Sequence, residues 1–187
     1  MNIIIFGPPG AGKGTQAKLI AQTNNLSHLS SGELSRQMMT NKTHGAKIKA
    51  CLDAGKLVPN KIIINIVEKY IEKNKIEPGF IFDGYPRNIT QAKALDKLAK
   101  KHQTKIDLVI NLSLSEDEAL KRIILRGKTS GRSDDNIRTT KNRLKIYRER
   151  TEPVLNYYKN QNKLKIVDGR QSIKKIASEI KKIISHL

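Results

Sequence analysis

The sequence predicts an α/β fold in three layers, with a central parallel sheet covered by helices on both faces. Two observations support this prediction. Short apolar runs alternate with longer segments of helical periodicity, and strands that alternate with helices along a chain usually form a parallel sheet. The 187 residues also contain no internal repeat, low-complexity block or long linker, so they fit one globular domain with a sizeable core.

The predicted strands are short apolar runs at residues 3–6, 80–82, 108–112 and 164–167. The first run has no basic residues ahead of it and ends at once in Gly7-Pro8-Pro9-Gly10. We therefore interpret it as a buried strand and not as the apolar segment of a signal peptide.

Three helices are predicted from apolar residues at helical spacing and from capping residues. The clearest is the last one, for which Ser172 is the expected N-cap. Its apolar stripe consists of Ile173, Ile176, Ala177, Ile180, Ile183, Ile184 and Leu187. Ser115 and Glu118 form a capping box ahead of a second helix. A third helix is marked by the apolar face Ile63, Ile66, Val67 and Tyr70.

Two segments fit the alternation of strands and helices poorly, and we expect them to be inserts. One covers residues 31–59. The other covers residues 127–137 and is polar and rich in small residues. Because such a loop buries little apolar surface, it should open easily and is a candidate lid.

The charge balance is strongly basic, since 36 lysine and arginine residues against 17 aspartate and glutamate residues give a formal charge of +19. A protein with this charge attracts polyanions such as nucleotides or nucleic acids. Many lysines stand singly on predicted helix faces, as a compositional bias of a solvated surface would place them. We favour this interpretation over a dedicated nucleic-acid site, because few aromatic residues are present to stack on bases.

The single cysteine, Cys51, excludes an intrachain disulfide and a zinc site with several cysteines. His28, His44, His102 and His186 have no metal-binding spacing. No apolar run approaches the length of a membrane span. These observations predict a cytoplasmic protein.

A glycine-rich segment after the first predicted strand has the form of a phosphate-binding loop. It reads Gly7-Pro8-Pro9-Gly10-Ala11-Gly12-Lys13-Gly14-Thr15-Gln16. Glycines let such a loop curl so that its N–H groups point at phosphate oxygens, and the following helix adds its positive N-terminal end. Lys13 would sit against the β- and γ-phosphates. Gly14 stands where the usual loop has Ser or Thr, so Mg²⁺ is expected to rest mainly on phosphates and water.

Charged residues follow at the ends of predicted elements. Asp83 ends a strand, at the edge of a parallel sheet where ligands bind. Its carboxylate is suited to hold Mg²⁺ through water, although an Asp-Gly turn at a strand end is also common for structural reasons. Arg87 follows Pro86, and its planar guanidinium suits bidentate binding of phosphate. Arg122 and Arg126 are four residues apart and share one face of a predicted helix.

These motifs resemble the nucleoside monophosphate kinases over nearly the whole chain, and among them the adenylate kinases with a short lid. The matching segments are GKGTQ at 12–16, LSSGELSR at 29–36, GKLVP at 55–59, FDGYPR at 82–87 with Gln91, RG at 126–127 and RSDD at 132–135.

The resemblance implies one P-loop domain over residues 1–187, with a parallel five-stranded sheet, an AMP-binding insert at 31–59 and a short lid at 127–137. It implies reversible, Mg²⁺-dependent transfer of a phosphoryl group from ATP to AMP by direct in-line attack, giving two ADP. The implied partners are ATP, AMP and ADP, with no dedicated nucleic acid, no membrane and a monomeric state. Relatives with a longer lid hold zinc, which this short lid without cysteine is not expected to bind.

The resemblance also assigns site residues. The expected catalytic set is Lys13, Arg87, Arg126, Arg132 and Arg143. The ATP-binding set is Gly10, Ala11, Gly12, Lys13, Gly14, Thr15, Arg122 and Arg126, with Arg170 as an additional candidate although it matches no motif. The AMP-binding set is Ser31, Arg36, Lys56, Leu57, Val58, Gly84, Arg87, Gln91, Arg132 and Arg143, and Asp83 is the expected contact to Mg²⁺.

Two polar residues are expected at the base of AMP. Gln91 would pair with the adenine edge, because a side-chain amide both donates and accepts, although it also fits an ordinary first-turn helix residue after Thr90. The Ser31 hydroxyl would touch the adenine. Ser30 or Ser31 could equally be a helix N-cap, and Ser30 with Glu33 forms a capping-box pattern.

Other functions share part of this pattern. A UMP/CMP kinase would have the same fold and chemistry with another acceptor base, and Gln91 argues against it. A nucleic-acid-binding P-loop ATPase is suggested only by the charge of +19 and would need a basic tract with interleaved aromatic residues. A non-catalytic nucleotide sensor would have no use for the arginine set.

Overall fold

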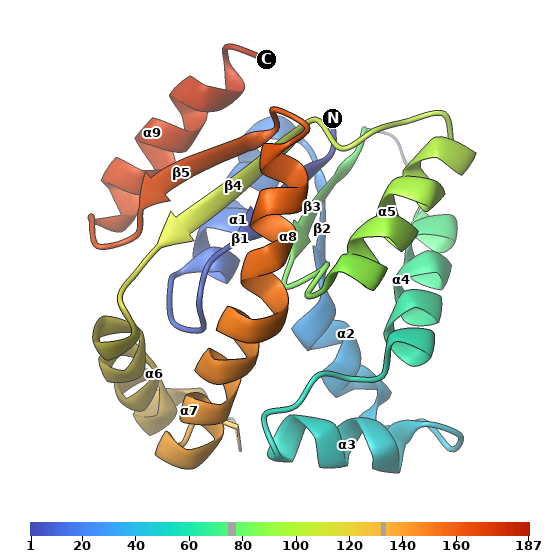
Figure 1. Cartoon of the computed structure of the whole chain (residues 1–187), viewed down its shortest axis with the longest axis vertical. Helices are drawn as coiled ribbons and strands as arrows, with labels where there is room; N and C mark the ends of the chain where they lie inside the picture. The colour runs from blue at the N-terminus through green and yellow to red at the C-terminus, as the bar shows by residue number, and fades with distance from the viewer. Residues whose placement is uncertain (75–77, 132–133) are drawn as a thin grey trace.

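In the computed structural model, the chain forms a parallel sheet between two layers of helices (Figure 1). The structure describes residues 1–74, 78–131 and 134–187. The strands are β1 (Ile3–Phe6), β2 (Ser27–Ser30), β3 (Phe80–Asp83), β4 (Leu108–Ser113) and β5 (Leu164–Asp168). They lie in the order β2-β3-β1-β4-β5, and every neighbouring pair is parallel. The predicted fold class is confirmed.

Four strands coincide with the predicted apolar runs, but β2 has no such run. Its sequence Ser27-His28-Leu29-Ser30 contains one apolar residue. The strand lies at the edge of the sheet and pairs only with β3 among the described strands. An edge strand needs less apolar sequence than a central one, and this explains why periodicity alone did not reveal it.

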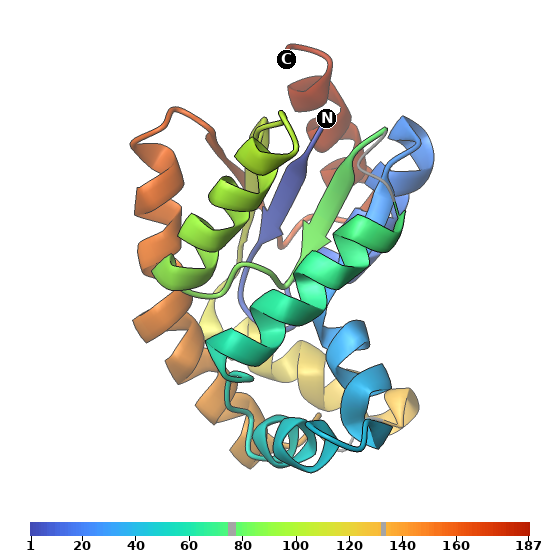
Figure 2. The same cartoon turned by 90° about the vertical axis from the view of Figure 1, so that its right-hand side faces the viewer.

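The helices cover both faces of the sheet (Figures 1 and 2). On one face α1 (Lys13–Asn24) and α9 (Ile173–Ile184) pack against β1 residues such as Ile3 and Ile5. On the other face α4 (Asn60–Asn74), α5 (Ile89–Lys101) and α8 (Glu152–Lys159) pack against Ile4 and Phe6. Alternate β1 side chains thus enter opposite cores, as the pleat requires. None of the helices in the described parts of the chain is long and apolar enough to cross a membrane.

Capping residues begin several helices where the sequence predicts them. The Ser172 hydroxyl accepts from the N–H of Lys175 at the start of α9. Ser115 accepts from the N–H of Glu118 at the start of α6 (Glu116–Ser130). Ser30 likewise caps α2 (Ser31–Gln37). The sequence allowed either Ser30 or Ser31 as this N-cap, and the structure shows that it is Ser30.

The two predicted inserts lie at the end of the sheet where the strands terminate (Figure 1). Residues 31–59 contain α2, a short 3₁₀ helix η1 (Met38–Thr40) and α3 (Gly45–Asp53). The predicted polar loop at 127–137 is shorter than expected, because its first four residues form the last turn of α6. Gly127 permits this arrangement, since a Cβ there would lie 2.6 Å from the carbonyl oxygen of Asp135 on the returning chain.

A long helix runs from the second insert back to the body of the molecule. It consists of α7 (Ile137–Ile146), the π-helical turn η2 (Tyr147–Thr151) and α8. Val154 and Tyr158 of α8 are fully buried in the core. The helix therefore joins the end of the predicted lid segment to the core of the molecule.

Candidate active site

A cleft of about 610 Å³ opens where the strands end, between the 31–59 insert and helices α6 and α7. Strand β1 lies between β3 and β4, so the chain passes to opposite sides of the sheet at this point. Parallel α/β sheets bind ligands at such a switch point, beyond the carboxyl ends of the strands.

The glycine-rich loop between β1 and α1 lines this cleft. Gly12, which precedes α1, has a φ of 86°, in the left-handed region that favours glycine. A Cβ at Gly10 would lie 2.8 Å from the carbonyl oxygen of Ala119 on α6. The loop therefore needs glycine at position 12 for its backbone conformation. It needs glycine at position 10 for the close approach of α6.

Lys13 lies across this loop. Its Nζ donates to the carbonyl oxygens of Gly7 and Pro8, each at 2.8 Å. Burial lowers the pKa of Lys13 to about 7; the carboxylate of Asp83 opposes this effect, and the arginines facing the cleft add to it. An anion bound beside Lys13 would relieve the repulsion from these neighbouring cations.

Asp83 ends β3 beside the loop. Its Oδ2 lies 3.7 Å from Nε2 of His28, and a Cβ at Gly14 would lie 3.3 Å from the same oxygen. Burial alone would raise the pKa of Asp83, but His28, Lys13 and Arg87 outweigh it, so the pKa lies below its usual range. The carboxylate is therefore ionised at neutral pH and offers the hard oxygen that Mg²⁺ prefers.

The described residues contain no group of three or more His, Cys, Asp or Glu side chains that could hold a metal ion. A metal at Asp83 would therefore take its other ligands from water and bound phosphate. Magnesium commonly binds in this way, with one or two carboxylates and the phosphates of a substrate.

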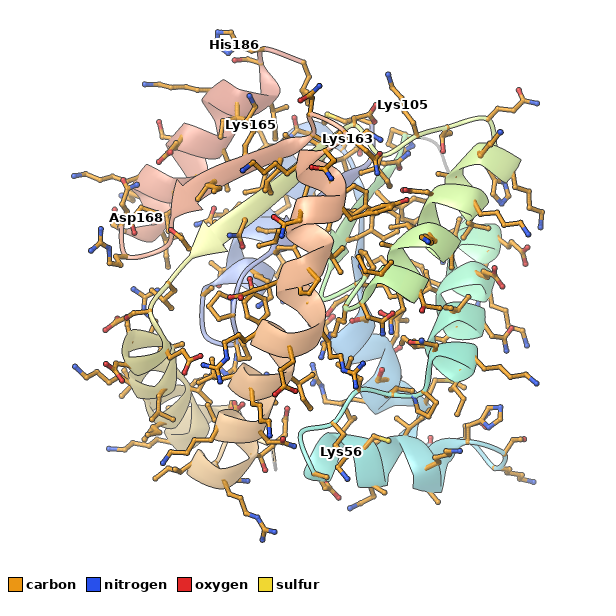
Figure 3. All side chains as sticks on the ribbon, in the orientation of Figure 1. Lys56, Lys105, Lys163, Lys165, Asp168 and His186 are labelled. Atoms are coloured by element: carbon orange, nitrogen blue, oxygen red, sulfur yellow. The ribbon has the colours of Figure 1, made fainter. Side chains whose placement is uncertain are left out.

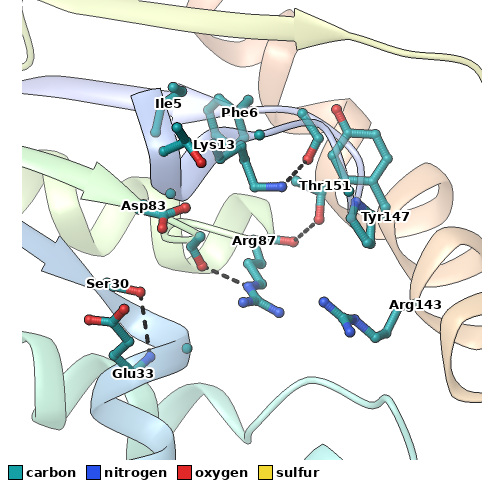
Figure 4. A pocket seen from close by; sticks show the side chains of 18 of the residues that line it. Ile5, Phe6, Lys13, Ser30, Glu33, Asp83, Arg87, Arg143, Tyr147 and Thr151 are labelled. Carbon is teal, nitrogen blue, oxygen red and sulfur yellow. Dashed lines mark hydrogen bonds between the residues drawn. The ribbon is translucent and has the colours of Figure 1, made fainter. Parts of the chain in front are cut away.

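Arg87 is held by three hydrogen bonds around its own backbone and side chain. Its Nε donates to the carbonyl oxygen of Gly84 at 2.7 Å, and its N–H donates to Oε1 of Gln91 at 2.7 Å. Its carbonyl oxygen accepts from Oγ1 of Thr151 at 3.0 Å (Figure 4). Burial lowers the pKa of Arg87 to about 10, and the charge of Arg143 adds to this effect.

Arg126 and Arg143 extend from α6 and α7 and line the same cleft, where Figure 4 shows Arg143 facing Arg87. Nε and Nη2 of Arg126 donate to the two carboxylate oxygens of Asp135 at 2.7 and 2.6 Å. Nη1 of Arg143 donates to Oδ2 of Asp134 at 3.0 Å and to Oδ1 of Asp135 at 3.3 Å.

These pairs shift the pKa values of their members in different directions. The hydrogen bond to Asp135 raises the pKa of Arg126, whereas burial lowers that of Arg143. Burial would raise the pKa of Asp135, but Arg126 outweighs it and lowers that pKa. The two arginines are thus compensated by neighbouring carboxylates, and Arg132 lies outside the described residues.

Arg122 and Arg36 complete the charged lining. Arg122 donates from Nε to Oε1 of Glu118 and from Nη1 to the carbonyl oxygen of Gly169, both at 2.8 Å. Arg36 lies on α2, and its charge contributes to the lowered pKa of Arg87 across the cleft.

The structure brings most of the predicted site residues to one cleft. Those lining it are Gly10, Gly12, Lys13, Gly14, Thr15, Arg36, Leu57, Asp83, Gly84, Arg87, Arg122, Arg126 and Arg143. The predicted residues outside this lining are Ala11, Ser31, Lys56, Val58, Gln91 and Arg170.

Several of the residues outside the lining have other partners. Gln91 is 2% exposed; its amide holds Arg87 and donates through Nε2 to Oδ1 of Asn60 at 2.9 Å. The Ser31 hydroxyl donates to the carbonyl oxygen of Gly84. Arg170 is 73% exposed and pairs with Asp168 at 2.9 Å. These contacts show what the side chains do in this structure, and a nucleotide contact for them stays a prediction.

The lining residues that sequence reasoning missed include Tyr147 and Thr151 of η2. The hydroxyl of Tyr147 donates to Oδ1 of Asn111 at 3.3 Å, and burial raises its pKa. Neither residue belongs to a quoted motif. The available signal was Pro153, since a proline within a helical segment marks a local change of helix geometry.

Comparisons with known proteins identify a family for this chain. The family model described as adenylate kinase matches residues 5–163. The adenylate kinases of Parabacteroides distasonis and Azobacteroides pseudotrichonymphae are 40% and 42% identical over 188 residues, which cover all of this chain and 99% and 98% of those proteins. The adenylate kinase of Flavobacterium psychrophilum is 39% identical over 189 residues that cover both chains completely. The phosphate-binding loop, the arginine-lined cleft and these similarities together lead to one conclusion: the chain belongs to the adenylate kinase family.

Proposed function

We propose that this chain is a phosphotransferase that moves a phosphoryl group reversibly between MgATP and AMP, giving two ADP. The observation that carries the proposal is the convergence of cations on the cleft. Lys13, Arg87, Arg126 and Arg143 all line the cleft, and the charges of the three arginines lower the pKa of Lys13. Phosphoryl transfer depends on positioning and charge neutralisation more than on covalent chemistry, and such a cluster serves both needs.

The two nucleotides occupy different parts of the cleft. ATP binds along the loop between β1 and α1, with Lys13 at its phosphates and Arg122 toward its adenine and ribose. AMP binds beside the 31–59 insert, where Arg36, Leu57 and Arg87 line the cleft. Gln91 accepts from the N–H of Arg87 and Ser31 donates to the carbonyl oxygen of Gly84, and this proximity to two lining residues supports a role near the acceptor base.

The reaction is a direct in-line displacement. A phosphate oxygen of AMP forms a bond to the γ-phosphorus while the bond from that phosphorus to the β,γ-bridging oxygen breaks, and the leaving ADP keeps the electron pair. Lys13 and the loop N–H groups hold the triphosphate. The arginines screen the repulsion between donor and acceptor and then stabilise the charge on the transferring group.

Arg126 and Arg143 reach the phosphates by exchanging partners. Each is already paired with Asp134 or Asp135. Exchanging a carboxylate for a phosphate keeps the guanidinium hydrogen-bonded throughout, which costs less than burying an unpaired cation. Arg132 would join them when the lid at 127–137 and the 31–59 insert close and exclude water.

Mg²⁺ fits the residues present at the end of β3. The ionised Asp83 would hold it through water, and the nucleotide phosphates would supply the remaining ligands. Bound there, Mg²⁺ would neutralise charge on the triphosphate. The chain's own contribution is to keep this carboxylate close to Lys13, with Gly14 leaving space for it.

The deciding experiment is ADP formation from MgATP with AMP, CMP or UMP as acceptor. A strong preference for AMP supports the proposal and a role of Gln91 at the base. Turnover mainly with CMP or UMP would move the substrate to pyrimidines while keeping the mechanism. Absence of transfer to any monophosphate would overturn the kinase proposal.

The same assay at two salt concentrations addresses the nucleic-acid alternative. Lys56 lies at the opposite end of the molecule from Lys105, Lys163 and Lys165 (Figure 3), so these lysines do not form one patch. Hydrolysis of ATP stimulated by nucleic acid, with binding that falls steeply as salt rises, would favour the alternative.

We further propose that the enzyme acts as a monomer in the cytoplasm. The single Cys51 is compatible with a reducing compartment. Light scattering coupled to size-exclusion chromatography gives the mass in solution, and fractionation of cells gives the location. A dimeric mass or an extracellular pool would contradict the corresponding part of this proposal.

A further inference from the structure

The π-helical turn η2 places the hydroxyl of Thr151 against the backbone of Arg87, one of the site arginines. Thr151 lines the cleft and is 5% exposed. Its Oγ1 donates to the carbonyl oxygen of Arg87 across 64 positions of sequence (Figure 4). A buried hydroxyl bound to the backbone of a site residue is a candidate for setting the position of that residue.

The wide turn follows from the local sequence. Pro153 lies in the first turn of α8 and has no N–H to donate to Glu149 four residues earlier, and its ring would collide with that carbonyl in a regular α-helix. The backbone instead forms a hydrogen bond at the wider spacing of a π-helix, in which the N–H of Glu152 donates to the carbonyl oxygen of Tyr147. π-helical turns within α-helices occur frequently at functional sites.

The peptide of Arg87 is held from both sides. Gln91 accepts from its N–H, and Thr151 donates to its carbonyl oxygen. Gln91 lies on α5 and Thr151 lies just before α8. These two helices are themselves joined, because the hydroxyls of Tyr157 and Tyr158 on α8 both donate to Asp96 on α5. Of the two residues that bind the Arg87 peptide, Thr151 is the one on the long helix of α7, η2 and α8, which also carries Arg143.

We propose that Thr151 is a positioning residue for Arg87. Through its hydroxyl, the helix that carries Arg143 is tied to the backbone of Arg87, and the two guanidinium groups keep a fixed relation around the acceptor phosphate. This inference rests on the proposed function, in which Arg87 binds the phosphate of AMP. It adds a residue that none of the recognised motifs contains.

The test compares Thr151→Val, which removes the hydroxyl at nearly constant shape, with Thr151→Ser, which keeps it. For Thr151→Val we expect kcat/KM for AMP to fall about tenfold, with the KM for ATP changed less than about twofold. Thr151→Ser should recover most of the loss. A purely structural hydroxyl would instead lower the thermal midpoint and leave both kinetic constants unchanged.

The control is Thr140→Val on α7. Thr140 is fully buried, and its Oγ1 has no hydrogen-bond partner among the described residues. The substitution makes the same chemical change on the same long helix without removing a hydrogen bond, so AMP kinetics should stay at the wild-type level. If Thr151→Val does not fold, Thr151→Ala provides the measurement, with the same selective loss expected.

A double-mutant cycle shows whether Thr151 acts through Arg87. In an Arg87→Ala background, adding Thr151→Val should change kcat/KM for AMP less than about twofold. Full additivity of the two losses would overturn the inference. An active wild-type enzyme with unaltered Thr151→Val kinetics would overturn it alone, whereas a wild-type enzyme inactive toward AMP would overturn the proposed function and this inference together.

Discussion

Lys13 combines a partly buried position with a charge that the site needs only when phosphate is bound. Its pKa of about 7 in the free protein lies far below the ordinary value of 10.5. A bound triphosphate favours the charged form and raises this pKa. Nucleotide binding is therefore linked to proton uptake. At a pH above the pKa of Lys13 in the free protein, the free site holds fewer protons than the complex.

The prediction is an uptake of close to one proton per MgATP at a pH about one unit above 7, and little uptake about one unit below. Titration calorimetry in buffers of different ionisation enthalpy measures this number. Negligible uptake at both pH values would show that Lys13 is already charged in the free protein.

Replacing Lys13 tests its role in the reaction. Lys13→Met removes the charge at the triphosphate but only two hydrogen bonds to loop carbonyls, so the fold should survive. We expect kcat to fall by about two to three orders of magnitude, with an unchanged circular dichroism spectrum. Lys165→Met on the exposed edge strand β5 is the matched control and should keep wild-type rates. Near wild-type rates for Lys13→Met would refute the assignment.

The sequence predicted which residues lie at the cleft better than it predicted which partners their side chains bind. Lys13, Asp83 and Arg87 of the quoted motifs line the cleft, because loop spacing and strand ends fix where they emerge, whereas Lys56 does not line it. Gln91 and Ser31 are different, since in this structure they bind Arg87 and Gly84. An amide or hydroxyl accepts many partners, and sequence alone does not tell which one lies within reach.

At the scale of single elements, the sequence predicted what depends on apolar periodicity and missed what depends on tertiary contacts. Strand β2 at the sheet edge had no apolar run to reveal it. The last turn of α6 reads as polar loop, but the chain at Asp135 folds back onto it. The π-helical turn η2 was also missed, although Pro153 marks its position.

The contact between α6 and the residues just before α7 holds the two ends of the predicted lid segment together. The Asp135 side chain is fully buried and accepts from Arg126, Arg143 and Ser130. Asp135→Asn removes the charge from this arrangement. Because Arg126 is partly exposed, we expect a loss of only about 1–2 kcal/mol in the free energy of unfolding, with faster hydrogen exchange at the first turn of α7.

Asp168→Asn is the control for this measurement. Asp168 also binds an arginine, but its partner Arg170 is 73% exposed. Exposed pairs contribute little, so both the stability and the exchange of α7 should stay unchanged. Equal effects of the two substitutions would mean that burial of Asp135 has no special consequence for the lid segment.

At the scale of the whole molecule, the excess of positive charge should make stability depend on salt. A formal charge of +19 means net self-repulsion in the compact state, and salt screens it. We expect the thermal midpoint to rise by about 2–5 °C between low and moderate sodium chloride. Sucrose at matched osmolality separates this effect from water activity, and a midpoint that falls with salt would contradict the prediction.

The close approach of Gly14 to Asp83 has a consequence for the evolutionary history of this loop. A side chain at position 14 would bring its Cβ to 3.3 Å from the carboxylate, which lies against His28 on its other side. A serine, as in the usual phosphate-binding loop, would require the Asp83 carboxylate to shift by a few tenths of an ångström. A change from one loop type to the other is therefore coupled to the position of this carboxylate and, through it, to the contact with His28.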